Sequence, residues 1–86
     1  MSVSYNEMRS QSDDQLDLSG LNCPMPLLKT KQYLNNMAAG GSLFVVTTDQ
    51  GSVRDFRSYL DISKHRLVSA QQDSARGEYY FLIECG

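Results

Sequence analysis

A short stretch near the start of the chain links a predicted strand to a predicted helix. It reads Leu18-Ser19-Gly20-Leu21-Asn22-Cys23-Pro24-Met25-Pro26. A residue before proline avoids the α region, so Cys23 should lie just outside the helix. Pro24 suits the first helical position and Pro26 the first turn, where backbone N–H groups lack partners in any case. The stretch therefore predicts a cysteine fixed at the N-terminal end of a helix.

Apolar residues on either side of this stretch define the two flanking elements. Leu16 and Leu18 alternate with polar residues, which predicts a short strand that Gly20 ends. Good helix formers over 27–37 predict a helix, which the glycines at 40–41 stop. The apolar side of this helix is formed by Leu27, Leu34, Met37 and Ala38.

A second strand and a second helix follow. The run over 43–48 is β-branched and apolar on both faces, which is typical of a central strand. The segment over 49–52 breaks this strand, and Ser52 with Asp55 forms a weak variant of the capping box at a helix start. The apolar stripe of that helix is Val53, Phe56 and Leu60.

Two further strands, over 67–71 and 79–84, complete the predicted element order β-α-β-α-β-β. Right-handed crossovers place both helices on one face of the sheet. We therefore expect an α+β fold, a two-layer α/β sandwich made of one four-stranded mixed sheet and two helices. Its first three strands should run parallel, and the fourth should return by a hairpin.

The composition excludes several classes of protein. The 86 residues suffice for one domain, and eight Lys and Arg stand against ten Asp and Glu, for a net charge of −2. A stand-alone nucleic-acid binder would need a strongly basic surface. The longest aliphatic and aromatic run, over 43–46, is far shorter than the ~20 residues of a membrane span. We therefore expect no direct binding to nucleic acid or membrane.

The first part of the chain predicts a tail and a compartment. Residues 1–14 are mostly polar and show no sustained periodicity, which predicts a flexible N-terminal tail before a domain over 15–86. They contain no apolar segment of the signal-peptide kind, so we expect a cytoplasmic protein, and a monomer. A cytoplasmic compartment would keep Cys23 and Cys85 reduced.

The predicted topology places one thiol where anions bind. Cys23 follows the first strand and Asp49 the second, and both helices begin at that edge of the sheet, so their positive ends converge there. Ligands bind outside the carboxyl ends of parallel strands in many folds. Because prolines lack N–H groups, those of Met25 and Leu27 remain to face an anion.

A thiol at a helix start is favoured in its ionised form, with a pKa of ~3.5–7.5 in place of about 8.5. The thiolate is the nucleophile, so Cys23 is a candidate acceptor and donor of sulfur. A persulfide is one reversible state of such a cysteine. The alternative is an inert helix cap packed under a loop, since free cysteines are often buried. The residues by themselves leave both interpretations open.

Several polar residues should lie near Cys23. We interpret Asp49 as a turn or cap residue of the second helix, with a role in holding the loop beside Cys23 as the alternative. Asp55 suits the positive end of that helix, and Arg54 is placed to face an anionic group of a partner. The basic residues of the two helices are interpreted as solvated surface; they are Lys29, Lys31, Arg54 and Arg57.

The remaining titratable candidates lie at the opposite edge of the sheet. His65 precedes the third strand as an expected surface residue, and Cys85 forms an expected frayed end, roughly 17–20 Å from Cys23. A disulfide needs Cα atoms within about 7 Å, which leaves only an intermolecular pair open. Two cysteines and one histidine do not make a zinc site, so we expect no metal and no cofactor.

The stretch over 18–26 resembles the signature of the TusA (SirA-like) sulfur-carrier family, a Gly-Leu-x-Cys-Pro-x-Pro motif after a short strand. The resemblance continues through Asp49, Arg54-Asp55 and the segment over 65–68, and it covers about 15–84. Gln50 stands where the family commonly has a proline, so the loop beside Cys23 should have a different shape.

The resemblance implies a sulfurtransferase that carries sulfane sulfur as a persulfide on Cys23. It implies a cysteine desulfurase or rhodanese-like donor and an acceptor protein. The acceptor would serve tRNA 2-thiouridine formation, molybdenum cofactor maturation or sulfur oxidation. Pro24, Met25 and Pro26 match the motif, and Asp49, Ser52, Arg54 and Asp55 would form the supporting loop and helix start. The alternative function is a non-catalytic binding or regulatory module in which Cys23 is a structural cap.

Overall fold

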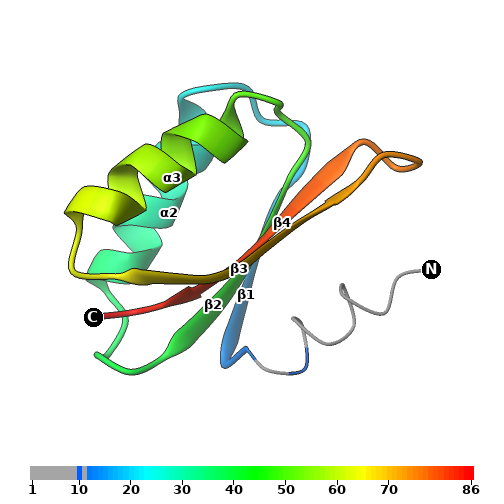
Figure 1. Ribbon diagram of the computed structural model, residues 1–86. Coiled ribbons are helices and arrows are strands. Elements are labelled where there is room, and N and C mark those ends of the chain that lie inside the picture. Colours follow the sequence, from blue (N-terminus) through cyan, green and yellow to red (C-terminus); the bar gives the residue numbers. More distant parts are fainter. Residues whose placement is uncertain (1–9, 11) are drawn as a thin grey trace.

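Strands and helices alternate along the chain in the predicted order. The structure is a computed structural model that describes Ser10 and residues 12–86. Its elements are β1 (Asp14–Leu18), α2 (Met25–Asn35), β2 (Ser42–Thr47), α3 (Ser52–Ile62), β3 (Arg66–Asp73) and β4 (Glu78–Glu84). Figure 1 shows both helices on one face of the sheet, which confirms the predicted two-layer α+β fold.

The four strands form one mixed sheet in the order β1-β2-β4-β3. Strands β1 and β2 pair in parallel, and β4 pairs antiparallel with both β2 and β3. Nearly all residues of β2 and the middle residues of β4 are buried, whereas exposure varies along β1 and β3. Strands β2 and β4 each have a hydrogen-bonded neighbour on both edges, so the two most buried strands form the centre of the sheet.

The main core lies between the helices and the sheet. Phe56 of α3 is fully buried and stacks on Phe81 of β4, with ring centroids 4.5 Å apart. Leu60 is buried and Val53 half-buried beside it, which confirms the predicted stripe of α3. A second cluster lies on the other face of the sheet and consists of Phe44, Val46, Tyr80 and Leu82.

Helix α2 packs most of its predicted apolar side on the core. Leu34 is buried, and Leu27 and Met37 are half-buried against the core cluster, whereas Ala38 is exposed. Pro26 and Thr30, which were not predicted, are also buried. Thr30 is tolerated in the core because its hydroxyl donates a hydrogen bond of 2.8 Å to the carbonyl of Pro26. Hydrophobic periodicity does not predict the burial of a polar residue whose hydroxyl is hydrogen-bonded within its own helix.

The start of the domain is tied to β2. The N–H of Asp13 donates to the carbonyl of Ser42 at 3.0 Å, and its carboxylate accepts from the N–H of Ser42 at 3.0 Å. Strand β1 therefore begins at Asp14, one residue before the expected domain start. Residues 1–9 and 11, the main part of the predicted tail, lie outside the described residues. In the described part of the chain, no helix is long and apolar enough to span a membrane.

Two expectations about the opposite edge of the sheet are wrong. His65 is 6% exposed and Cys85 only 2% exposed, so neither is a surface residue or a frayed end. Backbone hydrogen bonds join Cys85 to Gly40 and Gly41 at 2.7 and 2.8 Å, and Nδ1 of His65 accepts from the N–H of Gly86 at 3.0 Å. The turn after α2 thus extends the hydrogen bonding beyond β4 and holds Cys85 in the core.

Candidate functional site

The segment between β1 and α2 carries the exposed Cys23 at its tip. Gly20 has φ +84°, a left-handed conformation that favours glycine, and its N–H donates to the hydroxyl of Thr48 at 2.8 Å. The N–H of Leu21 returns to the carbonyl of Leu18 at 3.3 Å, which closes a turn. These contacts hold the segment against the end of β2, and Cys23 is exposed to solvent.

Helix α2 starts one residue later than the position of Pro24 suggested. Pro24 is the cap residue rather than the first helical residue, and its peptide bond to Cys23 is cis. The N–H of Met25 donates to the carbonyl of Asn22 at 2.9 Å. The expectation that this N–H faces an anion is therefore wrong, because the turn before the helix already uses it.

The first turn of α3 meets Cys23. The thiol donates a hydrogen bond to Oδ2 of Asp55 at 2.8 Å, across 32 residues of sequence. Gly51 caps α3, and a Cβ on it would lie 4.0 Å from the Cys23 sulfur and 3.2 Å from Oδ2 of Asp49. The predicted convergence of the two helix starts at Cys23 is confirmed. Gly51 and Thr48 were not among the predicted site residues, although a glycine directly before a predicted helix start was a signal for Gly51.

The electrostatics of Cys23 contradict the predicted easy ionisation. The pKa of the thiol is raised, chiefly by the hydrogen bond to Asp55, then by desolvation and by the negative charges of Asp55 and Asp49. The positive charge of Arg54 lowers it and offsets part of this rise. Carboxylates that approach from α3 and its preceding loop thus oppose the effect expected of a helix start.

The residues between β2 and α3 form a hydrogen-bonded turn, and none of their side chains caps α3. The carbonyl of Asp49 accepts from the N–H of Ser52 at 3.1 Å, so Asp49 is a turn residue, as expected. No side chain caps α3, and the carboxylate of Asp55 faces Cys23, so the predicted capping box is wrong. Among the described residues, the buried oxygens Oδ2 of Asp49 and Oγ of Ser52 have no hydrogen-bond partner.

The surroundings of Cys23 are open and partly apolar. Met25 and Leu28 of α2 are 40% and 43% exposed, and Arg54 of α3 is exposed. Pro26 points into the core instead. A second protein could therefore reach the thiol across apolar side chains from α2 and a charged rim from α3.

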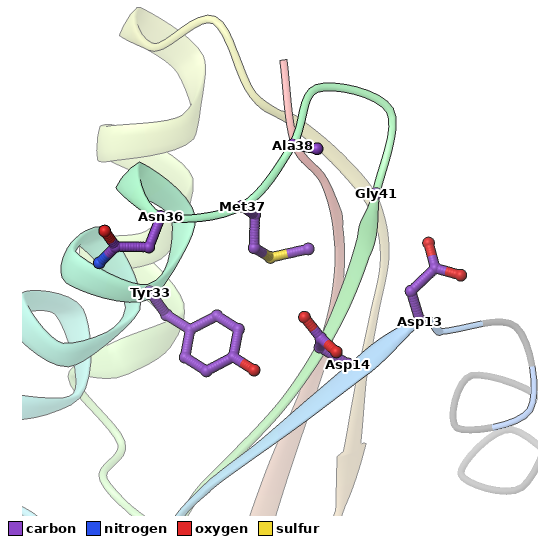
Figure 2. Close-up of a pocket in the computed structure, with 7 residues that line it drawn as sticks. All are labelled: Asp13, Asp14, Tyr33, Asn36, Met37, Ala38 and Gly41. Atoms are coloured by element: carbon purple, nitrogen blue, oxygen red, sulfur yellow. The ribbon is translucent and has the colours of Figure 1, made fainter.

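A separate cavity of about 530 Å³ lies near the start of β1 and the end of α2. Figure 2 shows the side chains of Tyr33 and Asp14 pointing toward each other from α2 and β1, with Met37 above them. Burial, and then the charge of Asp14, raise the pKa of Tyr33. None of the residues that line this cavity belongs to the predicted site. In the part of the chain that the structure describes, no three His, Cys, Asp or Glu side chains gather as a metal site would require.

Cys85 lies far from Cys23, as predicted. Its thiol donates to the carbonyl of Leu34 at 3.5 Å, near the end of α2, whereas Cys23 precedes that helix. The helix has 11 residues and is therefore about 16 Å long. The fold and the site thus define a small two-layer α+β protein that exposes one of its two thiols, at the start of α2.

The chain belongs to the TusA family. The family described as "Sulfurtransferase TusA" matches residues 14–85. The chain is 42% identical over 72 residues to "Sulfur carrier protein TusA" of Allochromatium vinosum, covering 84% of this chain and 92% of that protein. It is 38% identical over 68 residues to the protein of the same name from Pseudomonas putida, covering 79% and 85% respectively.

A solved structure has the same fold. The SirA-like protein from Desulfitobacterium hafniense superposes with a TM-score of 0.73 at 20% identity, covering 85% of this chain and 97% of that one. At this identity the similarity concerns the fold, and it agrees with the two-layer arrangement described above.

Proposed function

We propose that the protein is a sulfur carrier that holds sulfane sulfur as a persulfide on Cys23 and relays it to an acceptor protein. The observation that carries this proposal is an exposed Cys23 where two helices begin, within the Cys-Pro-x-Pro stretch. Relatives with the name "Sulfur carrier protein TusA" support it. In this proposal the protein is a sulfurtransferase that acts together with partner proteins.

The loading step needs no redox partner. The Cys23 sulfur attacks the outer sulfur of a persulfide on the donor, a new S–S bond forms, and the S–S bond of the donor breaks. The donor leaves as a thiolate that takes up a proton, and the proton of Cys23 is released. The products are a Cys23 persulfide and a donor thiol, so atoms and electrons balance. In the delivery step, a thiol of the acceptor attacks the outer sulfur of the Cys23 persulfide, and Cys23 leaves as a thiolate that takes up a proton.

The proposed site residues around Cys23 form two supporting groups, one at the start of α2 and one in the loop and first turn of α3. Pro24, Met25 and Pro26 would hold Cys23 at the start of α2. The supporting groups from the loop and the start of α3 would be Asp49, Ser52, Arg54 and Asp55. The expected donor is a cysteine desulfurase or a rhodanese-like protein in the cytoplasm. The acceptor would serve tRNA thiolation, molybdenum cofactor maturation or related sulfur trafficking, with no direct binding of nucleic acid.

Mass spectrometry of the intact protein tests the proposal. After incubation with a cysteine desulfurase and cysteine, the protein should gain the mass of a sulfur atom, and reduction should remove it. Cys23→Ser should not gain it, whereas the matched control Cys85→Ser should. Loading of Cys23→Ser, or equal failure of both variants with intact folds, would overturn the proposal.

A second candidate function is a binding or regulatory module in which Cys23 is chemically inert. The raised pKa of Cys23 favours it, because a protonated thiol is a poor nucleophile. It predicts slow alkylation of Cys23 across neutral pH and unchanged partner binding by Cys23→Ala. Fast transfer of sulfur to Cys23 from a loaded donor would exclude it.

A further inference from the structure

The hydrogen bond between Cys23 and Asp55 is unusual for a nucleophile. The thiol donates to the carboxylate at 2.8 Å, and this contact requires the proton to stay on sulfur. Loss of that proton would leave a thiolate directly against a carboxylate. The free protein therefore presents Cys23 in the form that reacts least.

We propose that Asp55 keeps the Cys23 thiol protonated and hydrogen-bonded until a cationic side chain beside the donor's persulfide pairs with that carboxylate. This role of Asp55 goes beyond support of the helix start. It also specifies the chemistry of the sulfur donor, and in that respect it rests on the proposed function. A donor with an anionic rim would leave the thiol protonated.

The charged groups around Cys23 agree with this role. Asp55 from α3 and Asp49 from the preceding loop both raise the pKa of the thiol, and Arg54 is the charged neighbour that lowers it. The carboxylate oxygen Oδ2 of Asp49 is buried and makes no hydrogen bond to Cys23. The carboxylate of Asp55 lies in contact with the exposed sulfur, so the same approach reaches both groups.

A cation paired with Asp55 would change the thiol in two ways. It would compete for the oxygen that accepts the Cys23 hydrogen bond, and it would cancel the charge that repels a thiolate. Both effects favour ionisation at the moment when the donor sulfur is within reach. The free carrier would react slowly with stray oxidants and electrophiles for the same reason.

Disulfide exchange with small charged probes tests this inference independently of sulfur loading. The probes are cationic cystamine, anionic dithiodipropionate and neutral hydroxyethyl disulfide. In each case the Cys23 thiolate attacks the probe, forms a mixed disulfide and releases a small thiol, so no other oxidant is needed. The background is Cys85→Ser, and the readout is the rate of mixed-disulfide formation at neutral pH.

The wild-type site should react several-fold faster with cystamine than with dithiodipropionate, and high salt should shrink this ratio. Asp55→Asn should also shrink it and should speed the reaction with the neutral probe. The expected gain is about threefold for every unit decrease in the thiol pKa, since lower basicity offsets part of the larger thiolate fraction. Asp55→Glu should restore the charge preference.

The matched control is Asp61→Asn, which removes the same charge from an exposed position near the far end of α3. An unchanged ratio in Asp55→Asn, or an equal change in both variants, would overturn the role of Asp55. The salt dependence of the wild-type ratio decides the matter even if Asp55→Asn fails to fold, because a salt-independent ratio contradicts the proposal. A protein that shows the charge preference but never accepts sulfur would refute the sulfur-carrier proposal alone.

Discussion

The N–H of Gly20 donates a hydrogen bond to the hydroxyl of Thr48, across 28 residues of sequence. The bond joins the turn after β1 to the residue that follows β2, at the edge of the sheet where the Cys23 segment begins. Gly20 makes it with φ +84°, a conformation that strains every residue with a Cβ. The position of the Cys23 segment therefore depends on a glycine that lies outside helix α2.

Gly20→Ala should lower the free energy of unfolding by about 1–2 kcal/mol, because alanine is strained at this φ although space for its Cβ exists. Urea unfolding measures the loss. Gly77→Ala is the matched control, since Gly77 also has a positive φ, of +64°, but lies in the β3–β4 turn. Both variants should lose stability, and only Gly20→Ala should alter the alkylation rate of Cys23. Equal rates in the two would contradict the positioning role of Gly20.

Phe56→Ala should destabilise the domain by about 3–5 kcal/mol, because it removes a fully buried ring and leaves a cavity against Phe81. Chemical denaturation followed by circular dichroism measures the change. Ile62→Ala on the same helix is the control: Ile62 is 87% exposed, so its loss should stay within about 0.5 kcal/mol. Similar losses in both variants would mean that α3 does not pack on the sheet as described.

The protein should lose stability in mild acid through His65. Burial, and then the charge of Lys64, hold the pKa of His65 below its usual value. A histidine with a lowered folded pKa stabilises the fold fully above its unfolded pKa of about 6.5, and this contribution disappears as pH falls through the folded pKa. Protonation also removes the acceptor for the N–H of Gly86. Urea unfolding at several pH values from neutral downward measures the loss.

His65→Gln tests the assignment of that pH dependence. The glutamine cannot titrate, so the difference in unfolding free energy between the two proteins should shrink as pH falls below about 6.5. Carboxylates contribute equally to both proteins and cancel in the difference. A difference that stays constant with pH would rule out His65 as the source.

Arg54→Gln should slow the reaction of Cys23 at neutral pH. The charge of Arg54 lowers the pKa of the thiol, so its removal should raise that pKa and reduce the thiolate fraction. The pH dependence of alkylation by iodoacetamide measures the effect, in a Cys85→Ser background. Arg57→Gln, at another exposed position of α3, should leave the profile unchanged. A lower apparent pKa in Arg54→Gln would contradict the electrostatics described for the site.

Much of the fold follows from short-range patterns in the sequence. The alternation around Leu16 and Leu18, the apolar run of β2 and the stripe of Val53, Phe56 and Leu60 each specify an element locally. The placement of Cys23 before α2 also follows locally, from the prolines on either side of Met25. Right-handed crossovers then place both helices on one face without further information.

Two kinds of contact explain most of the expectations that failed, contacts between distant segments and local hydrogen bonds that hydrophobic periodicity does not indicate. His65 and Cys85 are buried because the turn after α2 hydrogen-bonds to the C-terminus, which no local pattern indicates. Thr30 is buried because its hydroxyl pairs within the helix, against the usual hydrophobic periodicity.

The sequence by itself determined which cysteine stands at a helix start and which elements surround it, because proline geometry and hydrophobic periodicity act over a few residues. Only the tertiary structure decided the ionisation of that cysteine. Asp55 reaches Cys23 from 32 residues away because α2 and α3 pack side by side on one sheet. An electrostatic effect depends on distance in space, so the approach of this carboxylate outweighs the helix start that the sequence specifies.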